Sequence, residues 1–442
     1  MVPARRRARA LRQALAGPAP AHGRAHRHDD GQRQRQRERL GDAERERVLM
    51  AGRYIVDADS HVYEPPAIWT EYLSGSERVL VEEAFWHERG PAGTELTVVN
   101  GRSVRPLSPT RLNRYACWRP GSTPDSIGDL DPNEEHDTPG AADASARVAD
   151  LDTLGIDAQL VFPTLFAEHF PIVESPRAAV ALARAYNDWV TDFCAPARDR
   201  LHPVAVLPLQ SIPGALSELE RIADGGFAAV MLRPSYHDGR FLNHHDYAPV
   251  WKALADSGIV AAIHPSNGST NPEFTSSGQF VERVARHLAI GHDVAAAIAP
   301  EHDNMTAVLA LCYQGHREDY PQLKLALCHA GAAWFPLVLE KAETYLWLFP
   351  PGPIPVTLEP EELWLEQATL VTFDAWESCV GVMSDFYGRV AAWGSRYPQH
   401  DAAPPDEAIT MLEAHDVEDA TIAALMGGNA ARMYNLKVPA GA

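Results

Sequence analysis

A carboxylate and an imidazole stand two residues apart in the segment Asp57-Ala58-Asp59-Ser60-His61, directly after the apolar run Tyr54-Ile55-Val56. Side chains at i and i+2 of a β-strand point to the same side. Asp59 and His61 would therefore leave one strand on one face, which is the usual start of a metal site. Taken alone, the motif also fits an exposed turn with an incidental histidine.

Two more histidines end short apolar runs far downstream. Ala261-Ala262-Ile263 leads into His264-Pro265, and Leu325-Ala326-Leu327-Cys328 leads into His329, which Ala330-Gly331 follows. The same design, an apolar strand that ends in a ligand-type residue, therefore occurs three times. This repetition favours a metal site over an incidental histidine.

Short apolar runs alternate with amphipathic helical stretches such as 175–197 and 213–223, as expected for parallel strands that are covered on both faces. This pattern predicts a (β/α)8 TIM barrel, whose active site lies at the carboxyl ends of the strands. His61, His264 and His329 all fall at such ends. The eight strand candidates are 54–59, 158–163, 203–209, 228–234, 260–265, 324–329, 370–373 and 390–393.

Composition narrows the class of protein. The 442 residues are 45% hydrophobic, which is enough for a large core. The five cysteines form no Cys-x-x-Cys pair, and no apolar run approaches the roughly 18 residues needed to cross a bilayer. We therefore expect a soluble, cytoplasmic protein that is not held in a membrane.

Charge separates the first 49 residues from the rest. This stretch has 13 Arg and 6 acidic residues, which leaves 26 basic and 53 acidic residues, a net charge near −27, in the remainder. Such an acidic body disfavours nucleic acid as a partner. We interpret residues 1–49 as a disordered extension or as sequence upstream of a true start at Met50. Residues 50–442 would form the barrel domain, with an irregular insertion at about 74–146.

Further motifs point to a family. The closing Gly428-Asn429-Ala430-Ala431-Arg432 and the segments Gly155-Ile156-Asp157, Asn187-Asp188-Trp189 and Leu232-Arg233-Pro234 accompany the histidine motifs. From Val56 to about Leu436 the chain resembles the amidohydrolase-related family (amidohydrolase 2), which includes aminocarboxymuconate-semialdehyde decarboxylase and γ-resorcylate decarboxylase. The resemblance implies an amidohydrolase-superfamily barrel. It also implies that Asp59, His61 and His264 bind a divalent metal ion, with His329 as an acid/base or a further ligand.

Strand eight departs from the family. Family members read Gly-Ser-Asp-Tyr-Pro-His there, whereas this chain reads Gly394-Ser395-Arg396-Tyr397-Pro398. Arginine is a permanent cation with no acceptor, so Arg396 cannot take over the metal-binding or proton-accepting role of the carboxylate. Three explanations stay open: the site is inactive, it keeps a metal ion with substitute ligands, or it is rebuilt for other chemistry.

Spare donor groups favour the last two explanations. Glu64 follows the strand-one motif, and Glu377 follows strand seven. His302 and Asp303 follow strand five, at the start of a helix predicted over 304–314. Together with the first four residues they would suffice for two metal ions. We therefore add Glu64 and His302 to the predicted ligands, and we assign Glu377, Asp303 and Arg396 to catalysis.

Mixed imidazole and carboxylate ligation suits iron, manganese or zinc. The chain also resembles a branch of the superfamily, the non-haem diiron monooxygenases of platensimycin and platencin biosynthesis. That resemblance implies two iron ions, O2 and an external reductant or electron-donor partner. The implied reaction is hydroxylation of a terpenoid natural product in secondary metabolism, and the substrate is either free or bound as a coenzyme A thioester. A diiron monooxygenase is the favoured prediction.

Two alternatives stay open. One is a hydrolase or non-oxidative decarboxylase with one zinc or manganese ion, in which Asp401 or Glu377 replaces the lost aspartate. The other is a non-catalytic barrel that binds a small molecule. For the monooxygenase, Arg233 and Arg119, with Arg396 as a further candidate, are predicted to bind an anionic group of the small-molecule substrate, because guanidinium suits carboxylate and phosphate. A homo-oligomer is compatible with all of them.

Overall fold

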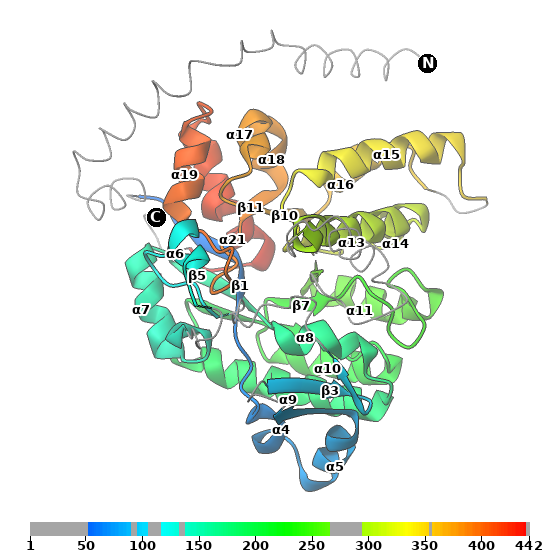
Figure 1. The fold of residues 1–442 in the computed structure, drawn as a ribbon. Coiled ribbons are helices and arrows are strands. Elements are labelled where there is room, and N and C mark those ends of the chain that lie inside the picture. Colours follow the sequence, from blue (N-terminus) through cyan, green and yellow to red (C-terminus); the bar gives the residue numbers. More distant parts are fainter. Residues whose placement is uncertain are drawn as a thin grey trace. The chain divides into compact units, whose positions relative to one another are not determined.

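The computed structural model describes residues 52–89, 95–104, 116–131, 138–265, 294–352 and 356–438. Within these ranges eight parallel strands form one sheet in the order β1-β5-β6-β7-β8-β9-β10-β11. Each strand matches a predicted one to within three residues at either end, so the predicted barrel is confirmed (Figure 1). The strands are β1 Val56–His61, β5 Ala158–Phe162, β6 Leu201–Val206, β7 Ala229–Leu232, β8 Val260–Ile263, β9 Leu325–Leu327, β10 Thr369–Phe373 and β11 Ala391–Trp393.

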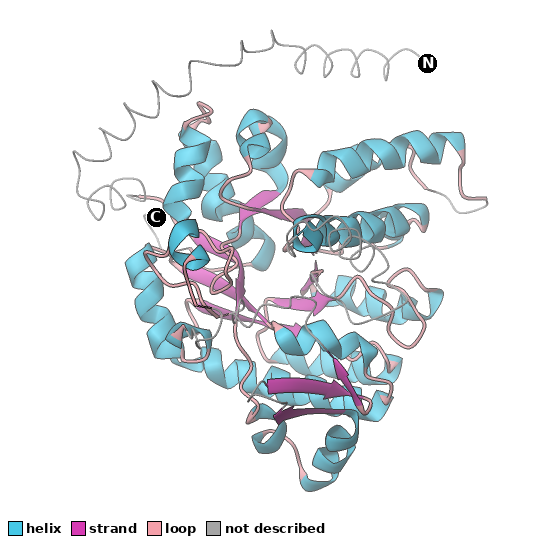
Figure 2. Ribbon diagram, viewed as in Figure 1, coloured by secondary structure: helices cyan, strands magenta, loops and turns pink. Residues whose placement is uncertain are grey.

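Helices alternate with these strands (Figure 2). Before β5 the chain forms α4 Ile68–Glu71, α5 Gly75–Ala84, α6 Pro124–Gly128 and α7 Ala144–Leu154. The later helices are α8 Leu165–His169, α9 Pro176–Cys194, α10 Ile212–Asp224, α11 Ala248–Ser257, α13 Val294–Tyr313, α14 His316–Asp319, α15 Trp334–Leu348, α16 Pro360–Glu366, α17 Ser378–Val382 and α18 Ser384–Val390. After β11 follow α19 Pro405–Glu413, α20 Asp419–Ala423, a π-helix Ala424–Gly428 and α21 Asn429–Tyr434.

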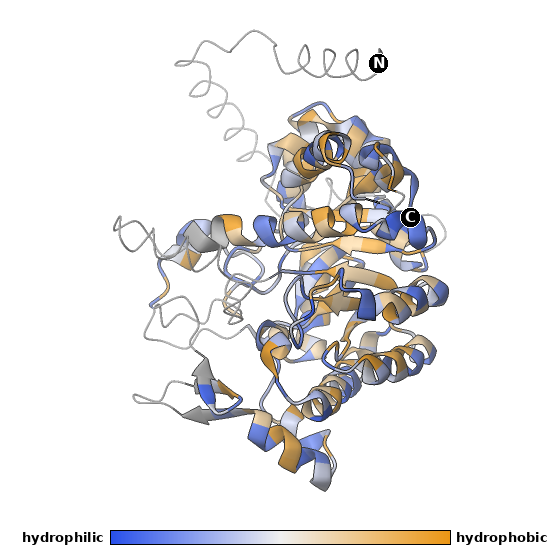
Figure 3. Cartoon of the chain, turned by 90° about the vertical axis from the view of Figure 1, so that its right-hand side faces the viewer, coloured by the Kyte–Doolittle hydropathy of each residue, from blue (hydrophilic) through white to orange (hydrophobic). Residues whose placement is uncertain are grey.

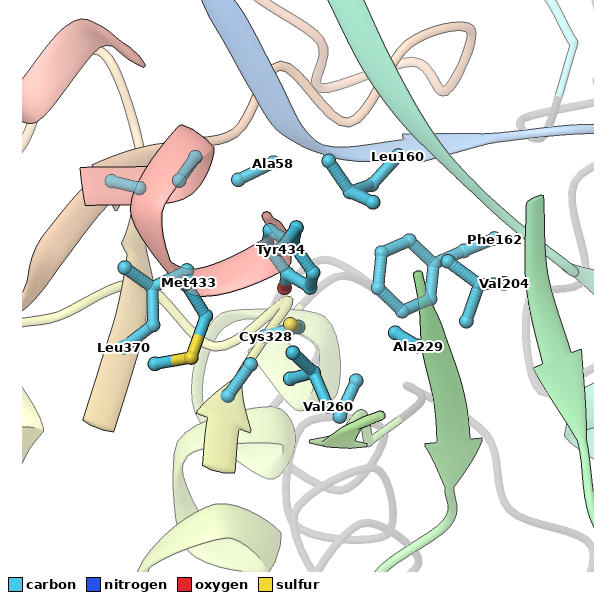
Figure 4. Packing of buried hydrophobic residues seen from close by; sticks show 14 of the residues in the cluster. Ala58, Leu160, Phe162, Val204, Ala229, Val260, Cys328, Leu370, Met433 and Tyr434 are labelled. Carbon is cyan, nitrogen blue, oxygen red and sulfur yellow. The ribbon is translucent and has the colours of Figure 1, made fainter. Parts of the chain in front are cut away.

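The barrel strands are buried on both faces, which explains their continuous apolar runs (Figure 3). Every second strand residue points into the barrel and packs against small or branched side chains of its neighbours. Helix α21 closes one end of this core. There Met433 lies beside Leu370, and Tyr434 points its hydroxyl toward the Cys328 sulfur (Figure 4).

The closure between β1 and β11 brings the first and last strands together. Asp57 accepts hydrogen bonds from the backbone amide and the hydroxyl of Ser395, at 2.9 and 2.5 Å. The amide of Arg396 donates to the Asp59 carbonyl at 2.8 Å. A Cβ at Gly394 would lie 2.7 Å from the Asp59 Cβ, so glycine is required for this close approach.

The segment predicted as an insertion contains a small antiparallel sheet. Strands β2 Phe85–Arg89, β3 Glu95–Val99 and β4 Arg102–Val104 form it, beside α5. The Arg-rich extension predicted for residues 1–49 lies outside the described residues. None of the helices in the described ranges is long and apolar enough to span a lipid bilayer.

One predicted helix boundary was wrong. The helix predicted to begin at Asn304 starts at Val294, and Pro300 lies inside it. Proline usually marks a helix start, but the alanine-rich residues before it have high helix propensity and extend the helix upstream. His302 and Asp303 therefore lie in the middle of α13 and not in a first turn.

Candidate active site

Four buried residues converge at the carboxyl ends of β1, β8 and β9. Asp59, His61, His264 and His329 each offer one ligand atom, and these four atoms all lie within 4.8 Å of one another. The Asp59 Oδ1 atom lies 3.2 Å from His264 Nε2 and 3.4 Å from His61 Nε2. The His329 ring stacks on His264 with centroids 4.6 Å apart. The three histidine motifs of the sequence thus meet around one carboxylate.

Backbone carbonyls fix the protonation of two of these rings. His61 Nδ1 lies 3.0 Å from the Pro163 carbonyl, and His264 Nδ1 lies 2.8 Å from the Pro265 carbonyl. Because a carbonyl oxygen only accepts, each Nδ1 must donate, and in the neutral ring each Nε2 keeps a lone pair. Both lone pairs then face the carboxylate of Asp59.

Such a group of acceptors is stable only if a cation or a proton lies between them. In the described structure, His61 Nε2 and His329 Nδ1 are buried without a hydrogen-bond partner. The donor set of one carboxylate and imidazoles suits a divalent transition metal ion. The residues therefore fit a mononuclear metal centre formed by Asp59, His61 and His264, with His329 beside it.

Burial dominates the electrostatics of the centre. Burial would raise the pKa of Asp59, but His264 and His61 together hold it well below its usual range. Burial lowers the pKa of His264, and Asp59 opposes this shift. Burial also lowers the pKa of His329 to well below its usual range, with smaller contributions from His264 and Arg396. Neutral imidazoles beside an ionised carboxylate are the protonation states in which these groups bind a metal ion.

A buried hydrogen-bond network supports the strand that carries Asp59 and His61. The Arg147 guanidinium is fully buried and donates to the carbonyls of His61 and Gly140. It also contacts Gln159 Oε1 at 3.3 Å, and Gln159 donates to Asp57 at 2.8 Å. The network joins α7, β1, β5 and the end of β11, so it fixes the direction in which the ligands point.

Arg396 stands at the sequence position of the family's strand-eight carboxylate, but its side chain pairs with other carboxylates. Its Nη1 lies 2.6 Å from Asp401 Oδ2, and its Nη2 lies 2.8 Å from Asp374 Oδ2 and 3.2 Å from the His329 carbonyl. Burial raises the pKa of Asp374, and the guanidinium opposes this shift by favouring the charged carboxylate. The positive charge of Arg396 is thus compensated by two carboxylates at the edge of the site.

Two strand-end residues of the site adopt a left-handed backbone. His329 has φ 63° and Arg396 has φ 60°. For residues with a Cβ this conformation costs about 1–3 kcal/mol and persists only where surrounding contacts impose it. Here the amide of His329 donates to Thr372 Oγ1, and that of Arg396 donates to the Asp59 carbonyl.

A pocket opens beside the four convergent residues, and Arg233, directly after β7, lines it. The Arg233 side chain is buried, and its Nη1 lies 3.3 Å from the Ala167 carbonyl. The pocket therefore offers a cation beside the metal ligands. Its lining residues are His61, Pro163, Thr164, Glu168, Met231, Arg233, His264, Pro265, His329 and Gln399.

The other predicted site residues lie elsewhere. His302 is exposed on α13, and Arg119 is exposed in a turn. Asp303 is buried near Arg233, and burial raises its pKa to about 7. Glu377 accepts hydrogen bonds from the backbone amides of Asp374, Ala332 and Ala333, so it joins the loops that follow β9 and β10. Neither His302 nor Glu377 joins the four convergent residues.

Glu64 is buried next to this pocket. Its Oε1 accepts a hydrogen bond from the Thr164 amide at 2.6 Å, while Oε2 is buried without a partner in the described structure. Burial raises the pKa of Glu64 to about 7. It lies outside the set of mutually close ligand atoms formed by the described residues.

This shift predicts how stability depends on pH. Between about pH 4.5 and 7 the folded protein keeps a proton on Glu64 that the unfolded chain has lost, so stability falls as the pH rises. Over that range the free energy of unfolding should decrease by on the order of 3 kcal/mol more in the wild type than in Glu64→Gln. Urea unfolding at pH 5 and 8 measures the difference, with Glu71→Gln, on the exposed side of α4, as the control. Equal pH dependence in wild type and Glu64→Gln would contradict the assignment.

Several functional residues escaped sequence reasoning. Thr164, Glu168 and Gln399 line the pocket, and Arg147 donates a hydrogen bond to the His61 carbonyl of β1. The position of Asp374 at the site could have been predicted, because this residue directly follows an apolar strand. Glu168 and Gln399 gave no such signal, since one lies in the short helix α8 and the other in an irregular segment, and the path of both depends on the whole barrel.

Comparison with known proteins places this site in a family. The amidohydrolase family model matches residues 56–436, most of the chain. The chain belongs to the amidohydrolase family. Within this family, γ-resorcylate decarboxylase from Rhizobium sp. (strain MTP-10005) is 29% identical over 127 residues, which span 27% of this chain and only 38% of that protein. The 6-methylsalicylic acid decarboxylase of Penicillium expansum is 27% identical over 272 residues, 58% of this chain and 75% of that protein.

A solved amidohydrolase-type structure gives the same fold. The dihydroxybenzoic acid decarboxylase from Polaromonas sp. JS666, which holds manganese, superposes with a TM-score of 0.57 at 16% identity. The match covers 88% of this chain and 99% of that one. At 16% identity this structural similarity establishes the barrel fold alone.

The prediction of a diiron monooxygenase was wrong. The relatives of this amidohydrolase are non-oxidative decarboxylases, so the terms monooxygenase, oxidoreductase and hydroxylation do not apply. Nothing in the comparisons supports two iron ions, an electron donor or a coenzyme A thioester. The structure shows why the count of donors was misleading: His302 faces solvent and Glu377 is bound by backbone amides, so neither adds a ligand to the group of Asp59, His61, His264 and His329.

Proposed function

We propose that this amidohydrolase is a metal-dependent, non-oxidative decarboxylase of a small hydroxylated aromatic acid. The observation that carries the proposal is the buried guanidinium of Arg233 in the same pocket as His61, His264 and His329. A planar guanidinium binds a carboxylate in two parallel hydrogen bonds. The names of the relatives, decarboxylases of γ-resorcylate and 6-methylsalicylic acid, supply the substrate class.

A divalent ion such as manganese or zinc, held by Asp59, His61 and His264, would supply a Lewis acid that stabilises negative charge on a substrate oxygen. Manganese in the Polaromonas decarboxylase supports this choice of metal. His61 and His264 keep the required tautomer through their carbonyl partners.

Side chains of the pocket bind the substrate and transfer the proton. Arg233 orients the carboxylate, and the surrounding buried residues limit the access of water. His329 accepts the proton of the substrate hydroxyl at Nδ1 and transfers it to the ring carbon. The bond from that carbon to the carboxylate then breaks and CO2 leaves. The bonding electron pair returns to the ring and restores its aromaticity as the phenolate, and solvent returns a proton to the phenolate oxygen. The left-handed backbone of His329 sets the direction of its ring.

Arg396 removes the general base that hydrolysis would need. Hydrolysis needs a general base that takes a proton from the attacking water. At the strand-eight position this chain has a guanidinium, and the two nearest carboxylates, Asp374 and Asp401, are both paired with it. Decarboxylation needs only delivery of a proton to carbon, which the neighbouring His329 provides.

The test is turnover of γ-resorcylate and 6-methylsalicylate by protein loaded with manganese or zinc, under air and under argon. We expect CO2 and the corresponding phenol at equal rates in both atmospheres and without a reductant. Arg233→Gln should raise KM about 30-fold or more, since loss of a buried charge partner costs about 2–5 kcal/mol. Arg119→Gln, in an exposed turn, is the matched control. A requirement for oxygen, or no turnover of any hydroxybenzoate with either metal, would overturn the proposal.

A further inference from the structure

A second pocket lies beside Glu64. It encloses about 460 Å³, including the part open to solvent. The two pockets share a wall, because Glu64 lines the second one and accepts a hydrogen bond from Thr164, which lines the first. The lining residues are Tyr63, Glu64, Pro66, Trp69, Phe85, His87, Thr97, Leu165 and Phe166.

Three aromatic rings form the apolar wall of this pocket. Trp69 lies 4.8 Å from Phe166 and 5.4 Å from Phe85, and the two phenylalanine rings are 5.8 Å apart, all measured between centroids. All three side chains are almost completely buried, so the rings support one another in fixed positions. Such a wall accepts an apolar group about the size of one ring.

Two buried polar atoms of the lining residues have no partner. In the described structure, Glu64 Oε2 and Trp69 Nε1 make no hydrogen bond, although the residues are only 7% and 6% exposed. Buried polar groups are nearly always satisfied, and each exception calls for a missing partner. The indole nitrogen can only donate, whereas the carboxyl oxygen accepts when ionised.

We propose that this pocket binds a ring-sized apolar group that carries a hydroxyl. A hydroxyl donates to Glu64 Oε2 and accepts from Trp69 Nε1, so one polar atom satisfies both. An ammonium group could not accept from the indole, and a carboxylate would face another carboxyl group. Two sources share this chemistry: a free phenol or alcohol, or the distal arm of a longer substrate whose acid group lies in the metal pocket. Only the second source rests on the proposed function.

Binding of 4-fluorophenol and 4-fluorotoluene to the metal-loaded protein, followed by ¹⁹F NMR, tests the pocket. The two probes share ring and reporter and differ in the hydroxyl. We expect the phenol to bind about tenfold more tightly, and Trp69→Phe, which keeps the ring but loses the donor, to remove that preference. Glu71→Gln, on the exposed side of the same helix α4, should bind as the wild type does. Glu64→Met provides the same comparison should Trp69→Phe fail to fold.

Kinetics separate the two sources. If the arm of a longer substrate enters the pocket, Trp69→Phe should raise KM for a hydroxybenzoate with a hydroxyphenyl substituent, leave its kcat unchanged and leave the parent hydroxybenzoate unaffected. If the ligand is a separate molecule, 4-fluorophenol binds but neither substrate responds. Equal affinity for both probes in the wild type, or unchanged affinity in Trp69→Phe and Glu64→Met, would overturn the proposal. The NMR result stands whether or not the protein is a decarboxylase.

Discussion

His264→Ala is expected to retain less than about one tenth of the wild-type metal ion and to lose at least about a thousandfold in activity. Even outer partners of metal ligands change affinity by about 10–100-fold, so loss of a ligand should cost more. The variant removes one of the two Nε2 atoms that lie within 3.4 Å of Asp59 Oδ1. His61→Ala should behave alike. Metal content after gel filtration, measured by atomic emission, gives the result.

The matched control is His302→Ala, because that histidine is exposed on α13 and lies outside the convergent group. Circular dichroism separates metal loss from unfolding. Full metal content in both His61→Ala and His264→Ala would show that the ions bind elsewhere.

Arg396→Asp is expected to lower the free energy of unfolding by at most about 3–5 kcal/mol, the cost of breaking a fully buried ion pair, and not to produce an efficient hydrolase. Loss of the guanidinium leaves its partners uncompensated, and here two part-buried carboxylates, Asp374 and Asp401, would meet a third. Urea unfolding measures the loss, with Arg389→Asp on the exposed side of α18 as the control.

A compensated variant sharpens this test. In the triple variant Arg396→Met, Asp374→Asn, Asp401→Asn the charges are removed together, so most of the stability should return. An Arg396→Asp protein as stable as the wild type, with strongly raised hydrolysis or decarboxylation, would show that Arg396 marks a degenerate site.

The sequence predicted the barrel, and the meeting of its ligand-type residues at the carboxyl ends of the strands, for a physical reason. Continuous apolar runs specify buried parallel strands, and the barrel places every carboxyl end on one face, so Asp59, His264 and His329 had to approach one another. Where ligand-type residues directly end a strand, position in the sequence therefore determines position in space.

The same reasoning failed for residues beyond the strand ends. His302 and Glu377 have suitable side chains, but the start of α13 ten residues earlier than predicted exposes the first, and the loop amides near Ala332 bind the second. The pairing of Arg396 with Asp374 was also hidden, since it depends on the left-handed turn at Arg396. The sequence shows which side chains could donate an electron pair to a metal ion, whereas the direction in which each side chain points depends on loop geometry.

The joining of β1 to the end of β11 has a consequence for biosynthesis. Asp57 and Ser395 are 338 positions apart, so their bond cannot form until almost the whole chain has left the ribosome. At about 5–20 residues per second this takes roughly 20–70 s, during which β1 has an unpaired edge. Exposed strand edges invite aggregation, so nascent chains of this protein should depend on chaperones. A metal ion that needs Asp59, His61 and His264 together would bind only after the chain as far as β8 has left the ribosome.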